Sequence, residues 1–159
     1  MPDGSPGVGD VAPAFTLPGT DNTEGGRRDY SLADYSGQPV VLVFYPGDNT
    51  PVCTRQLNAY TNDIAQFNEV GAQLLAISPQ SVESHEGFSC KQGGFAFPML
   101  ADEEKAVGKL YGVLGPVGFY RRSAFVIDGK GAIRYVHRAI AGLMFRPTAE
   151  LINAVKKAK

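Results

Sequence analysis

Residues 40–53 read VVLVFYPGDNTPVC, and this stretch contains the strongest structural signal of the chain. Its first six residues are a continuous apolar run, which is typical of a strand buried on both faces. Residues 46–49 break that run with turn-forming side chains. Thr50 is a favourable N-cap residue, and Pro51 suits the first helical position, where its missing N–H has no helical partner to lose. The stretch therefore predicts a central strand, a short loop and the start of a helix.

Cys53 falls in the first turn of this predicted helix. Backbone N–H groups in a first turn have no partner inside the helix, and the helix dipole is positive at that end. Such surroundings favour the thiolate over the thiol and make a cysteine reactive at neutral pH. A thiolate can attack disulfides, carbonyls or peroxides, so Cys53 by itself does not define the reaction.

The size and charge of the chain limit the classes of function. Its 159 residues fit one domain, residues 1–159, which can bury a core without a disulfide or a metal. The formal net charge is −1 and basic residues form only short pairs, so we expect no nucleic-acid partner. No apolar run approaches the length of a membrane span, and the N-terminal residues lack the features of a signal peptide. We therefore expect a cytoplasmic protein that does not bind membranes.

The chain contains two cysteines, Cys53 and Cys90, which form no Cys-x-x-Cys pair. Together with the two histidines, His85 and His137, they make a poor zinc-binding set, so we expect neither a metal nor a cofactor. In a reducing compartment, an isolated cysteine pair indicates redox chemistry or simple burial more often than a structural disulfide.

Hydrophobic periodicity predicts an α/β fold with a mixed central sheet flanked by helices. Strands are expected near residues 15–17, 40–45, 73–78, 124–128 and 132–137, and helices over residues 51–70, 81–91, 103–111 and from residue 147 onward. Residues 19–29 are expected to form a polar loop, and residues 95–100 an irregular segment or a short strand. The order gives a βαβ unit followed by a ββα unit.

Pro46, Thr50 and Cys53, spaced as Pro-x-x-x-Thr-x-x-Cys after a Phe-Tyr strand end, resemble the signature of the peroxiredoxins, the cysteine-dependent peroxidases. The fuller string FYPGDNTPVCT is most similar to the bacterioferritin-comigratory-protein branch, also called PrxQ. Three further segments match in order, at residues 78–85, 97–102 and 122–128. The resemblance extends over nearly the whole chain, from about residue 8 to residue 155.

The resemblance implies a thioredoxin-like fold, a hydroperoxide substrate and specific roles for four side chains. Cys53 would be the peroxidatic nucleophile, and Thr50 would form hydrogen bonds around the peroxide oxygens. Pro46 would shield the thiolate from water, while Arg122 would keep it ionised and polarise the O–O bond. These roles agree with the chemistry, because displacing an alkoxide from oxygen requires a thiolate and donors aimed at the developing negative charge. The residues alone do not bring Arg122 to Cys53.

The chain departs from the PrxQ pattern at two positions. Many members carry a second cysteine five residues after the first, where this chain has Asn58, and an acidic residue three positions after it, where this chain has Gln56. Other members place the resolving cysteine on the next helix, and Cys90 lies at that place. The resemblance therefore implies an atypical 2-Cys enzyme in which Cys90 condenses with the Cys53 sulfenic acid to an intramolecular disulfide. It also implies a monomer that is recycled by thioredoxin or a similar dithiol protein.

Two other interpretations remain open, and two rival classes are disfavoured. Cys90 could be an ordinary helix residue of a one-cysteine peroxidase that uses an external thiol, or Cys53 could serve a peroxide-sensing redox switch. A thioredoxin-type oxidoreductase requires a cysteine where Gln56 stands, and a glutathione-peroxidase-like enzyme requires a Trp, which this chain lacks. If Cys90 does resolve, a helix must unwind, and we expect the helix of Cys90 to do so, with the first turn near residues 50–54 opening as well. Gly87 weakens that helix by about 1 kcal/mol relative to Ala.

The remaining side chains near these motifs are expected to have structural roles. Asp48 and Asn49 fit a turn, and His85 fits a solvent-facing position on its helix. Arg121 is expected to be the solvated neighbour of Arg122. Phe44 and Tyr45 are expected to form core and pocket wall.

Overall fold

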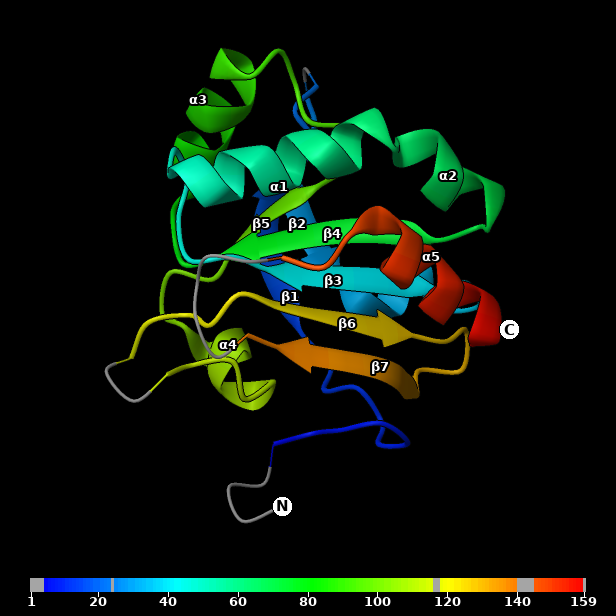
Figure 1. The fold of residues 1–159 in the computed structure, drawn as a ribbon. Coiled ribbons are helices and arrows are strands. Elements are labelled where there is room, and N and C mark those ends of the chain that lie inside the picture. The colour runs from blue at the N-terminus through cyan, green and yellow to red at the C-terminus, as the bar shows by residue number, and fades with distance from the viewer. Residues whose placement is uncertain (1–4, 24, 116–117, 140–144, 159) are drawn as a thin grey trace.

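The computed structural model describes residues 5–23, 25–115, 118–139 and 145–158 (Figure 1). The strands are β1 (Thr16–Thr20), β2 (Arg28–Ser31), β3 (Val40–Phe44), β4 (Gln73–Ser78), β5 (Met99–Ala101), β6 (Ser123–Ile127) and β7 (Ile133–Arg138). The helices are the 3-10 helix η1 (Leu32–Tyr35) and the α-helices α1 (Pro51–Asn62), α2 (Ile64–Glu69), α3 (Val82–Lys91), α4 (Ala106–Leu110) and α5 (Thr148–Lys157). No helix in these ranges is long and apolar enough to cross a membrane.

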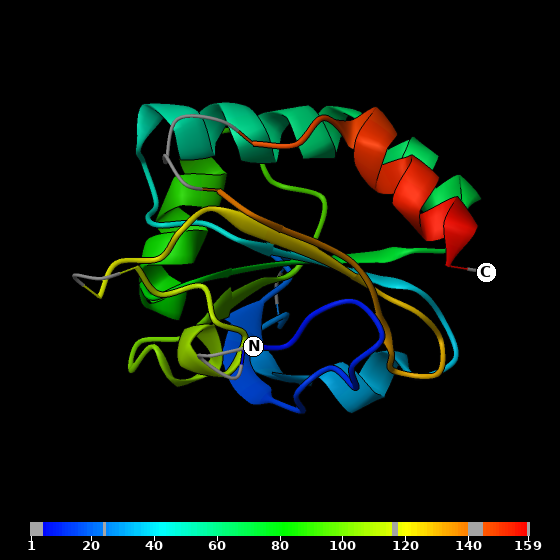
Figure 2. The same cartoon turned by 60° about the horizontal axis from the view of Figure 1, so that its bottom comes forward.

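The described strands form one seven-stranded sheet in the order β2-β1-β5-β4-β3-β6-β7. The pairs β3–β4 and β4–β5 are parallel, and the other pairs are antiparallel. Helices α1, α2 and α5 cover one face of the sheet, and the N-terminal segment, η1 and α4 cover the other (Figure 2). This arrangement confirms the predicted α/β class with a mixed sheet flanked by helices.

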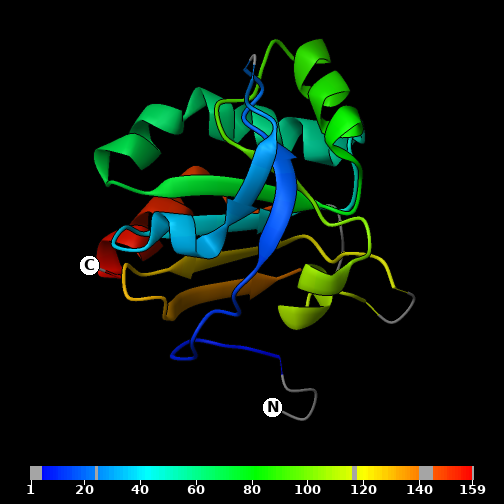
Figure 3. The ribbon, with the colours of Figure 1, turned by 180° about the vertical axis from the view of Figure 1, so that it is seen from behind.

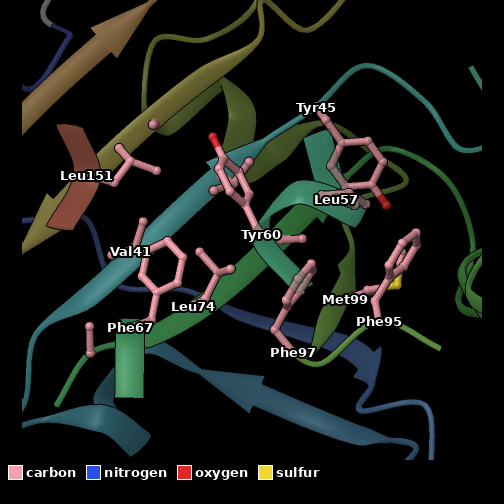
Figure 4. Close-up of a cluster of buried hydrophobic side chains, with 14 of the residues drawn as sticks. Val41, Tyr45, Leu57, Tyr60, Phe67, Leu74, Phe95, Phe97, Met99 and Leu151 are labelled. Carbon is pink, nitrogen blue, oxygen red and sulfur yellow. The ribbon is translucent and has the colours of Figure 1, made fainter. Parts of the chain in front are cut away.

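The core consists of two apolar clusters, one on each face of the sheet. Val41, Val43 and Tyr45 point into the cluster beneath α1, whereas Leu42 and Phe44 point into the opposite one. Because successive side chains of a strand alternate between faces, a strand covered on both sides must be apolar throughout. The apolar run at residues 40–45 has this origin, and Figure 4 shows part of the cluster beneath α1.

The helix predicted over residues 51–70 is divided into α1 and α2 at Asp63, whose backbone leaves helical geometry (φ −100°, ψ 13°). The Asp63 carboxylate accepts a hydrogen bond from the Thr148 hydroxyl at 2.7 Å. Short polar side chains that bond elsewhere compete with helix continuation. The break therefore lies where the helix meets the start of α5.

The predicted polar loop at residues 19–29 is shorter in the structure, because its two ends belong to β1 and β2, which pair as a hairpin and lie nearest the viewer in Figure 3. The strand β2 lies at the sheet edge, and of its four residues only Tyr30 is buried. An edge strand rich in charged residues has no apolar alternation to reveal it. The predicted hairpin of β6 and β7 and the predicted strand near residues 95–100, β5, are both present.

Candidate active site

The loop between β3 and α1 positions the start of the cysteine-bearing helix. Asn49 adopts the left-handed conformation at φ 64°, as expected for a turn former. Thr50 is extended (φ −84°, ψ 150°) at the N-cap position, and Pro51 is the first helical residue, as predicted. The Thr50 hydroxyl, however, donates to the Gly47 carbonyl at 3.2 Å and does not cap α1. Pro46 is half-buried in the same loop.

Cys53 lies in the first turn of α1 and has 0% exposure. The first helical hydrogen bond runs from Thr54 N to Thr50 O at 2.9 Å, so the N–H of Cys53 precedes the helical ladder. The buried stripe of α1 consists of residues at helical spacing, which are Cys53, Gln56, Leu57 and Tyr60. The thiol therefore faces the sheet from the positive end of the helix, and not the solvent.

Arg122 meets α1 one turn after the cysteine. Its guanidinium Nη1 donates to Gln56 Oε1 at 2.5 Å, and the side chain is buried, with 3% of the residue exposed. The sheet explains this meeting, because Ser123 pairs with Phe44 at the end of β3, where the chain turns towards α1. Arg122 directly precedes β6 and lies two residues before Ala124, which packs on the α1 side of the sheet. The structure thus brings Arg122 to Gln56, which lies on the helix that carries Cys53.

Two buried tyrosines bound this region as neutral phenols. Burial raises the pKa of Tyr60 to about 12, and its hydroxyl donates to the Arg146 carbonyl at 2.7 Å. Burial, followed by the Asp48 carboxylate, raises the pKa of Tyr45 well above its ordinary value, and the charge of Cys53 adds to the rise. Both side chains belong to the cluster around α1, and Figure 4 shows Tyr45 next to Leu57. Neither phenol supplies a negative charge near the cysteine at neutral pH.

The prediction that His85 faces solvent is wrong, because its side chain is fully buried. Its Nδ1 lies 2.8 Å from Asp48 Oδ2, and its Nε2 lies 2.9 Å from the Leu100 carbonyl oxygen. The Asp48 carboxylate also accepts from the Tyr45 hydroxyl at 2.7 Å and from the Ser84 hydroxyl at 2.7 Å. Asp48 is therefore more than a turn former. Hydrophobic periodicity could not reveal this cluster. A buried polar side chain is expected only where partners are present, and the partners of His85 lie in other parts of the chain.

Cys90 lies in the last turn of α3 and is exposed. It lines a surface pocket together with Asn22, Thr23, Glu86, Ser89, Gly93 and Gly94. Both cysteines are free thiols in the structure. Asn58 donates from Nδ2 to Gln92 Oε1 at 2.9 Å and so links α1 to the residue that ends α3. Asn58 thus has a structural contact at the position where many PrxQ members carry the second cysteine.

Arg121 is less exposed to solvent than the sequence predicted. Its side chain is half-buried, and its Nη2 donates to the Gly112 carbonyl at 3.0 Å. The neighbouring arginines therefore serve different contacts, since Arg121 reaches the end of α4 and Arg122 reaches α1.

A buried cysteine in the first turn of the helix that follows a central strand, with a buried arginine hydrogen-bonded to that helix, is the arrangement of a thiol-based redox protein. Comparison with known sequences identifies the family. Residues 8–136 match the AhpC/TSA family, and the chain belongs to it. The protein is therefore a peroxiredoxin, a thiol-dependent peroxidase by family.

Individual relatives agree with this assignment. A thioredoxin peroxidase of Echinococcus granulosus is 39% identical over 136 residues, which cover 81% of this chain and 69% of that protein. A chloroplastic peroxiredoxin Q of Sedum lineare is 37% identical over 152 residues, which cover 93% of this chain and 75% of that protein. The reduced 2-Cys peroxiredoxin of Plasmodium vivax superposes with a TM-score of 0.86 at 25% identity, covering 94% of this chain and 80% of that one. The predicted thioredoxin-like fold and the PrxQ resemblance are both confirmed.

Proposed function

We propose that this protein reduces hydrogen peroxide and alkyl hydroperoxides with Cys53 as the nucleophile. The observation that carries this proposal is the placement of Cys53 in the first turn of α1, with Arg122 held by Gln56 one turn later. The free N–H at Cys53 and the guanidinium are both suitable donors for an oxygen that gains charge. Thr50 would bond to the peroxide oxygens, and Pro46 would keep water from the sulfur.

In the first step, the Cys53 thiolate attacks the terminal oxygen of the hydroperoxide. An S–O bond forms as the O–O bond breaks, and two electrons pass from sulfur to the peroxide. Cys53 becomes a sulfenic acid, and the leaving alkoxide takes up a proton to give an alcohol, or water when the substrate is hydrogen peroxide. The arginine supports this step because it stabilises the negative charge that moves onto the leaving oxygen.

In the second step, the Cys90 thiol condenses with the Cys53 sulfenic acid, forming a disulfide and releasing water. An external dithiol protein such as thioredoxin then reduces the disulfide by two exchange steps and leaves with a disulfide of its own. Cys53 is fully buried and Cys90 is exposed on another helix, so the condensation requires a local opening, both of α3 and of the first turn of α1.

The pair Cys53→Ser and Cys90→Ser tests this cycle. With one equivalent of hydrogen peroxide, the wild-type protein should give a Cys53–Cys90 cross-link on peptide mass mapping. Cys90→Ser should consume that equivalent and stop at the sulfenic acid, whereas Cys53→Ser should consume peroxide at least about 10³-fold more slowly. An unchanged rate for Cys53→Ser would exclude the proposal.

The same experiment separates the two remaining interpretations. A one-cysteine peroxidase would turn over with a small external thiol even as Cys90→Ser and would give no cross-link. A peroxide-sensing switch would react once and would not turn over with thioredoxin and its reductase. Sedimentation of the reduced protein tests the expected monomer independently.

A further inference from the structure

The loop that leads to Cys53 is tied to α3 through one buried carboxylate, Asp48. Its two oxygens accept from the Tyr45 hydroxyl, the Ser84 hydroxyl and the His85 ring, and its backbone N–H donates to the Gln80 side chain. Ser84 and His85 belong to the first half of α3, and Asp48 lies between Pro46 and Thr50 in the active-site loop. The geometry of that loop therefore depends on the first half of α3.

The positions of the protons follow from the hydrogen bonds of His85. A carbonyl oxygen can only accept, so Nε2, which faces Leu100 O at 2.9 Å, must carry a proton. The contact of 2.8 Å between Nδ1 and Asp48 Oδ2 requires a second proton. The contact is therefore a hydrogen bond between two side chains that both have 0% exposure.

The two halves of α3 differ in the kind of contact that holds them. The first half has this buried hydrogen bond to Asp48, the bond to Leu100 and the surface ion pair between Glu86 and Arg27. Hydrogen bonds between charged groups are roughly twice as strong as neutral ones. The helix stands at one end of the sheet, beside the start of α1 (Figure 1).

The second half of α3 is held by neutral contacts alone among those the structure describes. Phe88 packs on Phe95 with ring centroids 5.0 Å apart, and Ser89 Oγ accepts from Phe95 N at 2.9 Å. Gln92 accepts from Asn58 at 2.9 Å. Gly87 lies between the two halves, is exposed, and has open space where a Cβ would be.

We propose that His85 is a positioning residue whose hydrogen bond with Asp48 holds the active-site loop and confines the opening of α3 to residues 87–92. The second half of α3, which carries Cys90, can then open while the first half and its contacts with the loop stay in place. This inference rests on the proposed role of Cys90 as the resolving residue. It assigns the buried histidine a function in the reaction, because release of the whole helix would remove two partners of Asp48 at once.

Amide hydrogen exchange of the reduced protein, measured by NMR, tests the confinement directly. The amides of Cys90, Lys91 and Gln92 should exchange at least about tenfold faster than those of His85 and Glu86. Equal rates along α3 would overturn the proposal. This measurement needs no peroxide, so a missing Cys53–Cys90 cross-link would refute the proposed resolving step without deciding the exchange pattern.

Variants of His85 and Asp48 test the link between helix and loop. His85→Leu removes both ring nitrogens, and it should abolish the difference in exchange and slow sulfenic acid formation at Cys53 at least about tenfold. Asp48→Asn, made in the wild-type background, can still accept from Tyr45 and donate to a neutral His85. It should therefore keep the exchange difference and the rate of sulfenic acid formation within about threefold of wild type. Ile133→Val, a core change on the opposite face, controls for lost stability.

Two results would overturn the role of His85. One is sulfenic acid formation at the wild-type rate in His85→Leu. The other is an equal slowing in His85→Leu and in the Ile133→Val control. Should His85→Leu fail to fold, the wild-type exchange pattern together with the rates of Asp48→Asn still decides the question, because loss of both properties in Asp48→Asn would also contradict the proposal.

Discussion

Helices α1 and α3 each carry one of the two cysteines, but at opposite ends and in opposite surroundings. Cys53 lies in the first turn of α1, at the positive end of a helix that packs along the sheet. Cys90 lies in the last turn of α3, which presents carbonyl groups and is exposed. The start of α1 can stabilise an anion at Cys53, whereas the exposed end of α3 can let the Cys90 side chain move away.

The comparison separates two requirements of the proposed catalytic cycle. Attack on peroxide needs fixed geometry, which the buried stripe of α1 and its contact with Arg122 supply. The proposed resolution needs a thiol that can move, and a helix that contains Gly87 and ends before Gly93 and Gly94 would supply it. The first three experiments below change one of these two sites at a time, and each should affect one step and spare the other, whereas the last measures the stability of a contact of α3.

Replacing Arg122 with Met should give the largest effect. The change removes the guanidinium but keeps a long apolar stem, so sulfenic acid formation at Cys53 should slow by about 10²–10³-fold. Rapid quenching followed by mass spectrometry of the Cys53 peptide measures this rate. Arg121→Met is the matched control, because that side chain contacts Gly112 and not α1. A loss of the same size in both variants would contradict the assignment.

Replacing Gln56 with Glu should give a smaller effect on the same step. A carboxylate in place of the amide that accepts from Arg122 at 2.5 Å would offset the charge of the guanidinium. Less thiolate would then be present at neutral pH, and sulfenic acid formation should slow by about tenfold, with its pH midpoint moved upward. Asn62→Asp adds the same charge at the exposed far end of α1 and should leave both unchanged. An identical pH profile in Gln56→Glu would exclude this reasoning.

The start of α1 could be predicted from sequence because all of its signals are local. Turn residues and Pro51 follow the apolar strand without interruption, and they fix where the helix begins. The approach of Arg122 could not be predicted from residues alone, because it depends on the pairing of Ser123 with Phe44 between distant strands. The family resemblance supplied that approach.

The contacts of α3 were harder to predict than those of α1. The buried residues of α3 are His85, Phe88 and Ser89, and only one of the three is apolar. A hydrophobic stripe of a single residue does not indicate which face of a helix is buried. The burial of His85 becomes understandable only when Asp48 and Leu100 lie beside it, and both are distant in sequence.

Replacing Gly87 with Ala should slow the second step and not the first. No atom lies within 4 Å of an added Cβ, so the change acts through helix propensity alone. A gain of about 1 kcal/mol in α3 should slow disulfide formation after a peroxide pulse by about fivefold. Gly7→Ala, also with open space around an added Cβ, is the control outside the helix. An unchanged rate of disulfide formation would mean that Gly87 has no part in the opening.

The smallest effect is expected from the surface pair that also holds the first half of α3. The hydrogen bond from Arg27 lowers the pKa of Glu86, so the folded protein releases this proton more readily than the unfolded chain. The stabilisation is therefore present above the ordinary pKa of 4.5 and is lost as the pH falls through the lower folded value. Thermal unfolding midpoints between pH 3 and pH 6 should fall more steeply for wild type than for Glu86→Gln, with Glu83→Gln as an exposed control on the same helix. Parallel curves for wild type and Glu86→Gln would remove this pair from the contacts that distinguish the two halves of α3, while the buried Asp48–His85 pair would still do so.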